Sequence, residues 1–243
     1  MLTKEELQRY SRQLDISRWG PASQERLKSS TVFIAGAGGL GSPVSIYLAA
    51  AGTGRIIICD SDHVEISNLN RQVLYSTGDI GKSKADAAAA ALSLLNPHVE
   101  IIPVHDEITE HNASGLIEGS DIIVDCLDSF RVRRFINRVS VNKSIPLVHG
   151  GISGFNGQAS FLAPPDTACL ACFLSDRKGS EPEPVAGAAA GLIGSIQAVE
   201  ALRYLTGLGS SLKGRLLFWD GAAMEFETIM LKKNPSCSVC GKP

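Results

Sequence analysis

The chain has 243 residues, with 23 Lys and Arg against 25 Asp and Glu, which gives a formal net charge of −2. Hydrophobic residues make up 44% and charged residues 20%, a globular composition that excludes extensive disorder. The length suits one large α/β domain or two small ones, and the charge balance gives no electrostatic footprint for nucleic acid. No apolar run reaches the roughly 18 residues of a membrane span, and the charged N-terminus is not an export signal. We therefore expect a soluble, cytoplasmic protein that binds neither membrane nor nucleic acid.

The first half of the chain alternates strands and helices. A capping-box pattern at Thr3 and Glu6 predicts a short N-terminal helix outside the βαβ unit. Apolar runs and helical periodicity predict the elements that follow. Strands are expected at 31–35, 55–59, near 101, 121–125 and 146–149, and helices at 42–51, 82–95, around 113 and after 128. The segment 61–81 has no clean period and is predicted to be a long ordered loop with a short helix, a type of loop that is usually functional.

The second half changes character. Strands are expected at 157–161, 215–220 and 225–231, and the last of them alternates in the antiparallel manner. A segment rich in Gly, Pro and Ala, 178–190, is predicted to be mobile and to precede a helix at 191–205. The chain has no internal repeat.

We predict an α/β fold, a doubly wound, Rossmann-like and mostly parallel sheet that is extended by antiparallel C-terminal strands. It forms a single domain over 1–243, with an N-terminal helical arm at 1–28, a nucleotide-binding core at 29–150 and a C-terminal part at 151–243.

A glycine-rich loop, Gly36-x-Gly38-x-x-Gly41, follows the first strand and opens the next helix. Glycines let the backbone approach a phosphate closely, and the helix N-terminus supplies free N–H groups and a positive dipole. Asp60 lies 19 residues after Gly41 at the end of the next strand, where a carboxylate holds the ribose hydroxyls of a nucleotide. The alternative is a tight turn that packs helix on sheet without a ligand. The motif alone does not choose between a dinucleotide and ATP.

Two cations and one further acid are expected at the same edge of the sheet. Asn68 and Arg71 follow the ribose position, Lys84 opens a helix, and Asp128 follows a later parallel strand. This set suits a triphosphate with Mg²⁺ better than a nicotinamide ring. Plainer alternatives remain at this point: Lys84 as a solvated helix residue, and Asp128 as the N-cap of the next helix. Asp125 is equally able to take the role of Asp128.

Two CxxC pairs, Cys169/Cys172 and Cys237/Cys240, are separated by 64 residues. Two such pairs fit a tetrahedral Cys₄ zinc site, which is usually structural, and its expected role is to pin the C-terminal tail to the body. A redox dithiol and two disulfides are the rival interpretations.

The other potential nucleophiles are assigned no catalytic role. Cys59 and Cys126 lie in or beside apolar strands and are expected to be buried packing residues. His149 ends a strand near the expected site, where a core or capping role is the favoured interpretation. The five histidines show no metal-ligand spacing.

Taken in order, these motifs resemble the MoeB/ThiF/HesA family, the bacterial relatives of ubiquitin-activating enzymes. The matching stretches are Arg9-Tyr-Ser-Arg-Gln13, Ile34-Ala-Gly-Ala-Gly-Gly-Leu-Gly41, Ser67-Asn-Leu-Asn-Arg-Gln72, Gly81-Lys-Ser-Lys84, Asp125-Cys-Leu-Asp128 and both CxxC pairs. A lone glycine motif would be weak, whereas an ordered set that runs almost end to end is highly specific.

The resemblance implies ATP-dependent adenylation of the C-terminal glycine of a ubiquitin-like sulfur carrier protein of the MoaD/ThiS type. The products are an acyl-adenylate, for later sulfur transfer, and pyrophosphate. It also implies a homodimer, a carrier with a C-terminal Gly-Gly bound through 151–243, and the cofactors ATP, Mg²⁺ and Zn²⁺. It leaves the carrier and the pathway open, among molybdopterin, thiazole, thiolated tRNA and other products.

By position, the resemblance also assigns residues. The nucleotide is expected on Gly36, Gly38, Gly39, Gly41, Asp60, Ser67, Asn68, Leu69, Asn70, Arg71, Lys84, Asp128 and Ser129. Mg²⁺ is expected on Asp128, and zinc on Cys169, Cys172, Cys237 and Cys240. Arg12, Arg71, Lys84 and Asp128 are the implied catalytic residues, and Arg12 is implied to reach ATP across the dimer interface. The plainer interpretation of Arg12 is an ordinary surface charge.

The chemistry agrees with these residues. A terminal carboxylate, with an ordinary pKa of about 3.5, is ionised at neutral pH and needs no general base. The obstacle is the attack of an anion on an anionic phosphate, which positioning and cations overcome.

The chain departs from the family pattern at two places. Some members carry a cysteine in the loop after the first CxxC, whereas 176–190 contains none, and Ser180 lies about where it would fall. We therefore expect the enzyme to stop at the acyl-adenylate and a separate donor to deliver sulfur. The second departure is Leu127-Asp128-Ser129, where the family more often has Thr-Asp-Asn; the shorter Ser129 is expected to alter contacts with the nucleotide.

Two other classes of function compete with this hypothesis. A nicotinamide- or flavin-dependent oxidoreductase would use the glycine loop and Asp60 but would leave Arg71, Lys84, Asp128 and the cysteine pairs unexplained. A noncatalytic nucleotide-binding scaffold for a carrier protein would bind without pyrophosphate chemistry.

Overall fold

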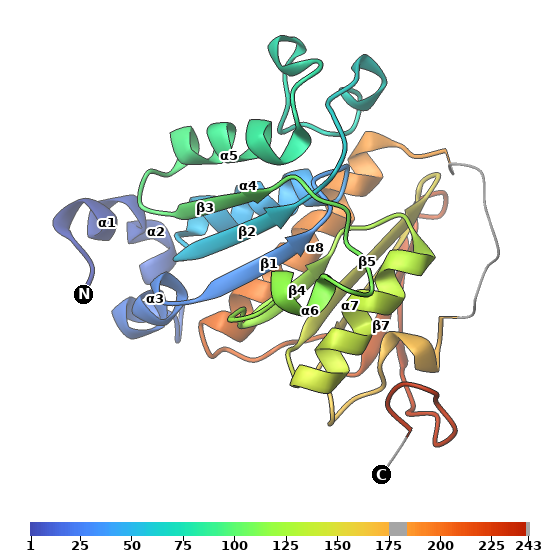
Figure 1. Ribbon diagram of the computed structural model, residues 1–243. Coiled ribbons are helices and arrows are strands. Elements are labelled where there is room, and N and C mark those ends of the chain that lie inside the picture. The colour runs from blue at the N-terminus through green and yellow to red at the C-terminus, as the bar shows by residue number, and fades with distance from the viewer. Residues whose placement is uncertain (175–183, 242–243) are drawn as a thin grey trace.

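The computed structural model describes residues 1–174 and 184–241. In these residues one sheet has eight strands in the order β3-β2-β1-β4-β5-β6-β7-β8 (Figure 1). The strands are β1 (Thr31–Ala35), β2 (Arg55–Cys59), β3 (Glu100–Val104), β4 (Ile122–Asp125), β5 (Leu147–Ser153), β6 (Asn156–Leu162), β7 (Arg215–Asp220) and β8 (Glu225–Met230). Strands β1 to β5 pair in parallel, and β6 to β8 continue the sheet in antiparallel pairing, as predicted.

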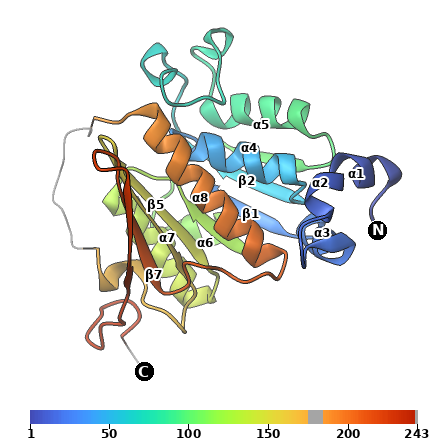
Figure 2. The ribbon, with the colours of Figure 1, turned by 180° about the vertical axis from the view of Figure 1, so that it is seen from behind.

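The central residues of the parallel strands are largely apolar because both faces of this part of the sheet are covered. In β1, Val32 and Ile34 point into the core on one face, whereas Phe33 and Ala35 point into the core on the other. Helices α4, α5 and α8 cover the first face, and α6 and α7 cover the second (Figures 1 and 2). The α-helices are α1 (Lys4–Arg9), α2 (Ser11–Leu14), α3 (Gly20–Lys28), α4 (Gly41–Ala51), α5 (Lys84–Leu95), α6 (Ala113–Leu116), α7 (Phe130–Lys143) and α8 (Gly187–Leu205).

The N-terminal arm packs beside the sheet as α1, α2 and α3. Thr3 caps α1 in the predicted capping box with Glu6. The side-chain amides of Gln13 and Gln24 both donate to the carbonyl of Ala51, at 2.7 and 2.8 Å. The arm is therefore anchored at the C-terminal end of α4, whereas the glycine loop lies at the N-terminal end of this helix.

The connections agree with the predictions, with one correction. The loop 61–81 is ordered and contains two short 3₁₀-helices, η1 (Ile66–Asn68) and η2 (Thr77–Asp79). Helix α8 begins at Gly187, so the last four residues of the segment predicted to be mobile are helical. Small residues pack closely there: a Cβ added at Gly187 would lie 2.4 Å from the carbonyl oxygen of Asn70. The rest of that segment, with Ser180, lies largely outside the described residues. Among the described helices, none combines the length and apolarity needed to cross a membrane.

Candidate active site

The glycine loop and the segment that leads to Asp128 meet at the switch point of the sheet. Strands β1 and β4 are neighbours, and the chain leaves β1 towards α4 on one face and β4 towards α7 on the other. Open α/β sheets bind ligands in the crevice that this divergence creates at the carboxyl ends of the strands. The two loops are in contact, because a Cβ added at Gly36 would lie 2.8 Å from the carbonyl oxygen of Cys126.

The four glycines of the loop divide into two kinds. Gly36 has a φ of +94°, and a Cβ at Gly41 would lie 2.1 Å from the Gly36 carbonyl oxygen, so the turn itself requires both. A Cβ at Gly38 would meet nothing closer than 3.6 Å, and one at Gly39 nothing closer than 3.3 Å. Tight packing alone therefore explains Gly36 and Gly41, whereas Gly38 favours close approach of a ligand to the backbone.

Asp60 lies beside the glycine loop at the end of β2. Its Oδ2 accepts a hydrogen bond from Ala37 N at 2.7 Å, and its Oδ1 accepts one from Asp62 N at 2.9 Å. Burial raises the pKa of this carboxyl, which the two backbone donors oppose. These contacts hold the carboxylate beside the glycine loop, and its contact with a ribose stays a prediction.

Lys84 is a buried cation rather than a solvated helix residue. Its Nζ lies 2.8 Å from Asp62 Oδ2, and its side chain is 7% exposed, against 67% for Asp62. Both residues line a polar cavity of about 360 Å³, together with Ser61, His63, Glu65 and Asn68. The cavity therefore presents one buried ammonium beside the carboxylates of Asp62 and Glu65.

Tyr75 ties the two sides of this region together. Its buried hydroxyl lies 2.8 Å from the carbonyl oxygen of Ala37 and 3.2 Å from that of Lys84. It therefore fixes the glycine loop relative to the first residue of α5.

The loop that follows Asp60 places Arg71 over the glycine loop. A Cβ added at Gly39 would lie 3.7 Å from Arg71 Cγ, and Arg71 Nη1 donates to Ser67 O at 2.9 Å and to Asn70 Oδ1 at 3.0 Å. Asn68 is buried, and its Oδ1 accepts from Glu65 N. The side chain of Asn68 therefore stabilises the loop itself through this hydrogen bond.

The remaining predicted residues of this loop have different surroundings. Leu69 packs against the hydrophobic core, and the hydroxyl of Ser67 donates to Glu65 Oε2 at 3.1 Å. A direct contact of either side chain with a nucleotide stays a prediction.

Asp125 and Asp128 are not interchangeable. Asp125 is fully buried, and His149 Nδ1 and the Arg133 guanidinium lie 2.7 and 3.2 Å from its Oδ2. Asp128 is exposed, and its carboxylate makes no hydrogen bond or ion pair within 1–174 and 184–241. The N-cap of α7 is Ser129, which accepts from Val132 N. Asp128 is thus available to a cation, and Asp125 is not.

The structure does not bring Arg12 to this site. It lies exposed on α2, next to Gln13, which contacts the C-terminal end of α4. Helix α4 has 11 residues, so at 1.5 Å per residue about 16 Å separate this end from the glycine loop.

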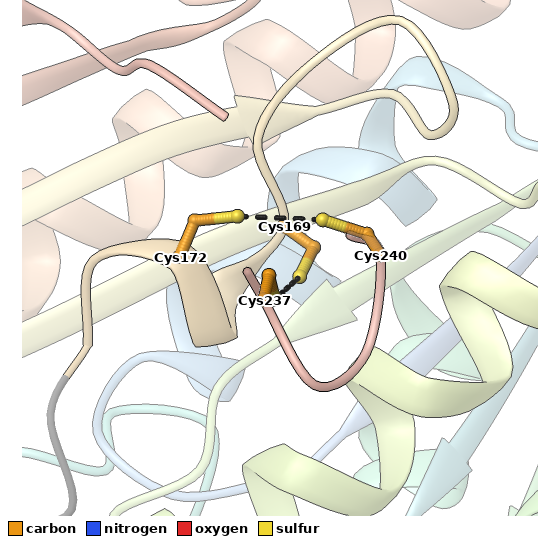
Figure 3. Close-up of side chains that lie close together, drawn as sticks. All are labelled: Cys169, Cys172, Cys237 and Cys240. Atoms are coloured by element: carbon orange, nitrogen blue, oxygen red, sulfur yellow. Dashed lines mark hydrogen bonds between the residues drawn. The ribbon is translucent and has the colours of Figure 1, made fainter. Parts of the chain in front are cut away.

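The four paired cysteines converge, as predicted (Figure 3). Their sulfur atoms all lie within 4.8 Å of one another, with Cys169 Sγ 3.8 Å from Cys237 Sγ and Cys172 Sγ 3.3 Å from Cys240 Sγ. Tetrahedral zinc with Zn–S bonds of about 2.3 Å requires sulfur atoms roughly 3.8 Å apart. The donor set and its spacing therefore fit a metal of this kind.

The cluster joins the C-terminal tail to α7. Asn137 Oδ1 accepts from Leu170 N at 2.9 Å, and its amide donates to Cys169 Sγ at 3.6 Å. Although burial raises the pKa of Cys237, the backbone N–H groups of Cys240 and Val239 lower it to about 7. A thiol of this kind is readily deprotonated to become a metal ligand.

Cys59 and Cys126 are buried, as predicted, and burial raises the pKa of both thiols, to about 12 for Cys59. His149 is fully buried, in agreement with its expected core role.

The fold and the site together define an α/β protein with a Rossmann-like sheet and a glycine loop at its switch point. The ThiF family model matches residues 10–239, and the chain belongs to the ThiF family. It is 44% identical over 243 residues to the SAMP-activating enzyme E1 of Haloferax volcanii, covering 98% of this chain and 90% of that protein. It is 40% identical to the sulfur carrier protein adenylyltransferase of Thermus thermophilus, covering 98% of this chain and 92% of that protein.

Solved structures share the fold. The crystal structure of E. coli MccB with ATP matches with a TM-score of 0.86 at 25% identity, covering 96% of this chain and 73% of that chain. The structure of PaaA matches with a TM-score of 0.82 at 26% identity, covering 96% of this chain and 76% of that chain.

Sequence reasoning missed Asp62, Tyr75 and Arg133. Asp62 is the partner of Lys84, and its only signal was its place two residues after Asp60. Tyr75 was a lone aromatic residue in a polar loop, and Arg133 one of several arginines in a helix. Their roles depend on contacts between segments far apart in the chain, which periodicity does not show.

Proposed function

We propose that this protein is an ATP-dependent adenylyltransferase that activates the C-terminal glycine of a ubiquitin-like sulfur carrier. The observations that support the proposal are the contacts that hold Asp60, Arg71 and Lys84 beside one glycine loop. The same loop contacts Cys126 and Leu127, the residues directly before Asp128. The names of the two relatives with 44% and 40% identity support it, since both cover nearly the whole chain.

Each of these residues has a separate role in the proposed reaction. A carboxylate oxygen of the carrier attacks the α-phosphorus, the bond to the bridging oxygen breaks, and pyrophosphate leaves with the electron pair. Arg71 and Lys84 neutralise phosphate oxygens, and Asp60 holds the ribose, while Gly38 allows the backbone to approach. The exposed carboxylate of Asp128 would hold Mg²⁺, which would supply further positive charge to the phosphates.

We infer that the active form is a homodimer in which Arg12 completes the site of the partner subunit. The support is the position of Arg12, which is exposed at the opposite end of α4 from the glycine loop of its own chain. A cation on that arm has no role in its own site.

We also infer that the four-cysteine cluster holds zinc and that its role is structural. All four ligand positions are protein thiols, which leaves no open coordination position for a substrate. In this scheme 151–243 carries both the zinc and the surface for the carrier.

The proposed reaction ends at the acyl-adenylate, and a separate donor supplies sulfur. Of the six cysteines, two are buried with raised pKa values and four form the cluster, so none is placed as a nucleophile. A DTT-sensitive adduct with the carrier that disappears in Cys59→Ser or Cys126→Ser would contradict this.

The first test is ATP–pyrophosphate exchange with and without a ubiquitin-like carrier ending in Gly-Gly. We expect exchange that requires the carrier and that Asp128→Ala lowers by about a thousandfold, the equivalent of about 4 kcal/mol. Tight ATP binding without exchange, with several carriers, would instead indicate a scaffold. Binding of NADH but not ATP would indicate an oxidoreductase.

A further inference from the structure

A buried charged network lies directly beneath the loop that carries Asp128. Asp125, Arg133 and His149 are at most 8% exposed, although all three are ionisable. None of them reaches the cavity at Lys84, and the proposed reaction uses none of them. Burying such groups is costly unless they are paired and hydrogen-bonded, so the network needs a reason.

The contacts of the network concentrate on Leu127, the residue before Asp128. The Leu127 N–H donates to Asp125 Oδ1 at 3.2 Å, and the Leu127 carbonyl accepts from Arg133 Nη2. Arg133 Nε also donates to Asp125 Oδ1, at 3.3 Å. Both peptide groups that flank Leu127 are therefore held by one ion pair.

The same arginine ties this loop to the next strand. Arg133 Nη2 donates to Gly150 O on β5 at 2.8 Å as well as to Leu127 O. The planar guanidinium thus contacts a carboxylate and two carbonyl groups from two neighbouring strand ends. An ammonium can replace its charge but not this fork of donors.

His149 holds the other oxygen of the carboxylate. Its Nδ1 lies 2.7 Å from Asp125 Oδ2, and its Nε2 lies 3.0 Å from Gln158 Nε2 on β6. Because the Gln158 amide donates, Nε2 is the acceptor and the imidazole proton is on Nδ1. From the opposite face of the sheet, Gln197 donates to Asp125 O at 2.8 Å. Asp125 is therefore fixed from both faces, and Arg133 connects it to the loop.

We propose that Arg133 is the positioning residue for Asp128: its fork clamps Leu127 between β4 and β5, so that the next carboxylate is held out towards the nucleotide. Asp128 makes no contact of its own in the described structure that would fix it. Its orientation consequently depends on the backbone on either side, which Ser129 caps on α7 and Arg133 holds at Leu127. The link to Mg²⁺ rests on the proposed function, whereas the clamp itself does not.

The first experiment tests the clamp without any ligand. Hydrogen exchange is measured by mass spectrometry on peptides that cover 126–132 in the wild type, Arg133→Lys and Arg138→Lys. Arg138 is a matched control, because it lies on the same helix but is exposed and paired with Glu110. We expect at least about tenfold faster exchange in 126–132 for Arg133→Lys only. Unchanged exchange would overturn the proposal.

The second experiment tests the consequence for the cation. Calorimetry gives the affinity for a nonhydrolysable ATP analogue in EDTA and across a series of Mg²⁺ concentrations. We expect Arg133→Lys to match the wild type in EDTA but to lose about tenfold of the Mg²⁺-dependent gain, while Arg138→Lys keeps it. A folded Arg133→Lys with the full gain would overturn the proposal, and a wild type without any gain would instead refute the proposed Mg²⁺ role of Asp128.

A double variant in which both charges are removed is used instead if Arg133→Lys does not fold. Asp125→Asn combined with Arg133→Gln leaves no unpaired charge in the core but removes the fork. The same loss of the Mg²⁺-dependent gain is expected, and retention of the full gain would overturn the proposal.

Discussion

The parallel and the antiparallel half of the sheet differ in how far their strands are buried. The parallel half, β1 to β5, is covered on both faces by helices, and the centres of its strands are largely apolar. The antiparallel half ends in β8, where all six residues are exposed, including Phe226 and Met230. In the described structure the parallel half is held by a core, whereas the end of the antiparallel half is held by one cysteine cluster and strand pairing.

The two halves of the sheet are suited to different roles. A rigid, doubly covered sheet can hold phosphate-binding groups within the small tolerances that chemistry requires. An open edge with exposed apolar residues is suited to contact with another protein. If this division holds, changes in the parallel half should abolish chemistry, and changes at the cysteine cluster should alter stability first.

The largest effect is expected when the proposed active site loses one of its charged side chains. Arg12→Ala and Asp128→Ala should each lose carrier-dependent exchange by a hundredfold or more, at roughly 3–4 kcal/mol per charge. Subunit exchange between the two variants should restore about a quarter of wild-type exchange, since half of the dimers are mixed and each holds one complete site. Activity that does not return on mixing would show that Arg12 acts within its own chain or not at all.

Loss of the cysteine cluster is expected to lower the stability of the fold but to leave nucleotide binding intact. It links segments 64 residues apart, and a cross-link across such a span contributes about 4 kcal/mol by constraining the unfolded chain. The double variant Cys237→Ser, Cys240→Ser should therefore melt at lower temperature and become susceptible to limited proteolysis after Met230, while it still binds ATP. Ser236→Ala, in the same tail, is the control, and an unchanged melting temperature would contradict the structural role.

The two kinds of glycine should respond in opposite ways. Gly41→Ala forces a Cβ to within 2.1 Å of a carbonyl oxygen and should reduce the free energy of unfolding by about 1–3 kcal/mol. Gly38→Ala meets no atom closer than 3.6 Å and should leave unfolding nearly unchanged while it weakens ATP binding. Urea titrations and calorimetry on both variants measure the two quantities, and equal effects would contradict the distinction.

The smallest effect concerns pH. Burial lowers the pKa of His149, so the unfolded chain takes up a proton more readily than the folded one. Stability should fall as the pH drops below about 6.5, by at most about 1.4 kcal/mol between pH 7.5 and 5.5. His149→Asn should lose this contribution, whereas the exposed control His111→Asn should keep it. Urea unfolding at the two pH values compares them, and an equal slope in both variants would exclude His149 as the source.

The sequence alone determined the strands of the sheet, its parallel-to-antiparallel change and the four-cysteine cluster. Each depends on local pattern or on spacing: apolar runs for β1 and β2, alternation for β8 and paired thiols for the cluster. Glycine and carboxylate at fixed intervals likewise placed Gly36 and Asp60, because the loop geometry requires those residue types.

Only the tertiary structure decided between residues that are alike in type and close in sequence. Asp125 and Asp128 are three residues apart, yet one is sealed against Arg133 and His149 and the other faces outward. Likewise, the burial of Lys84 against Asp62 required folding of the intervening loop. The physical reason is that burial and charge pairing are properties of contacts between distant segments, which determine whether a carboxylate serves the fold or remains available to a ligand.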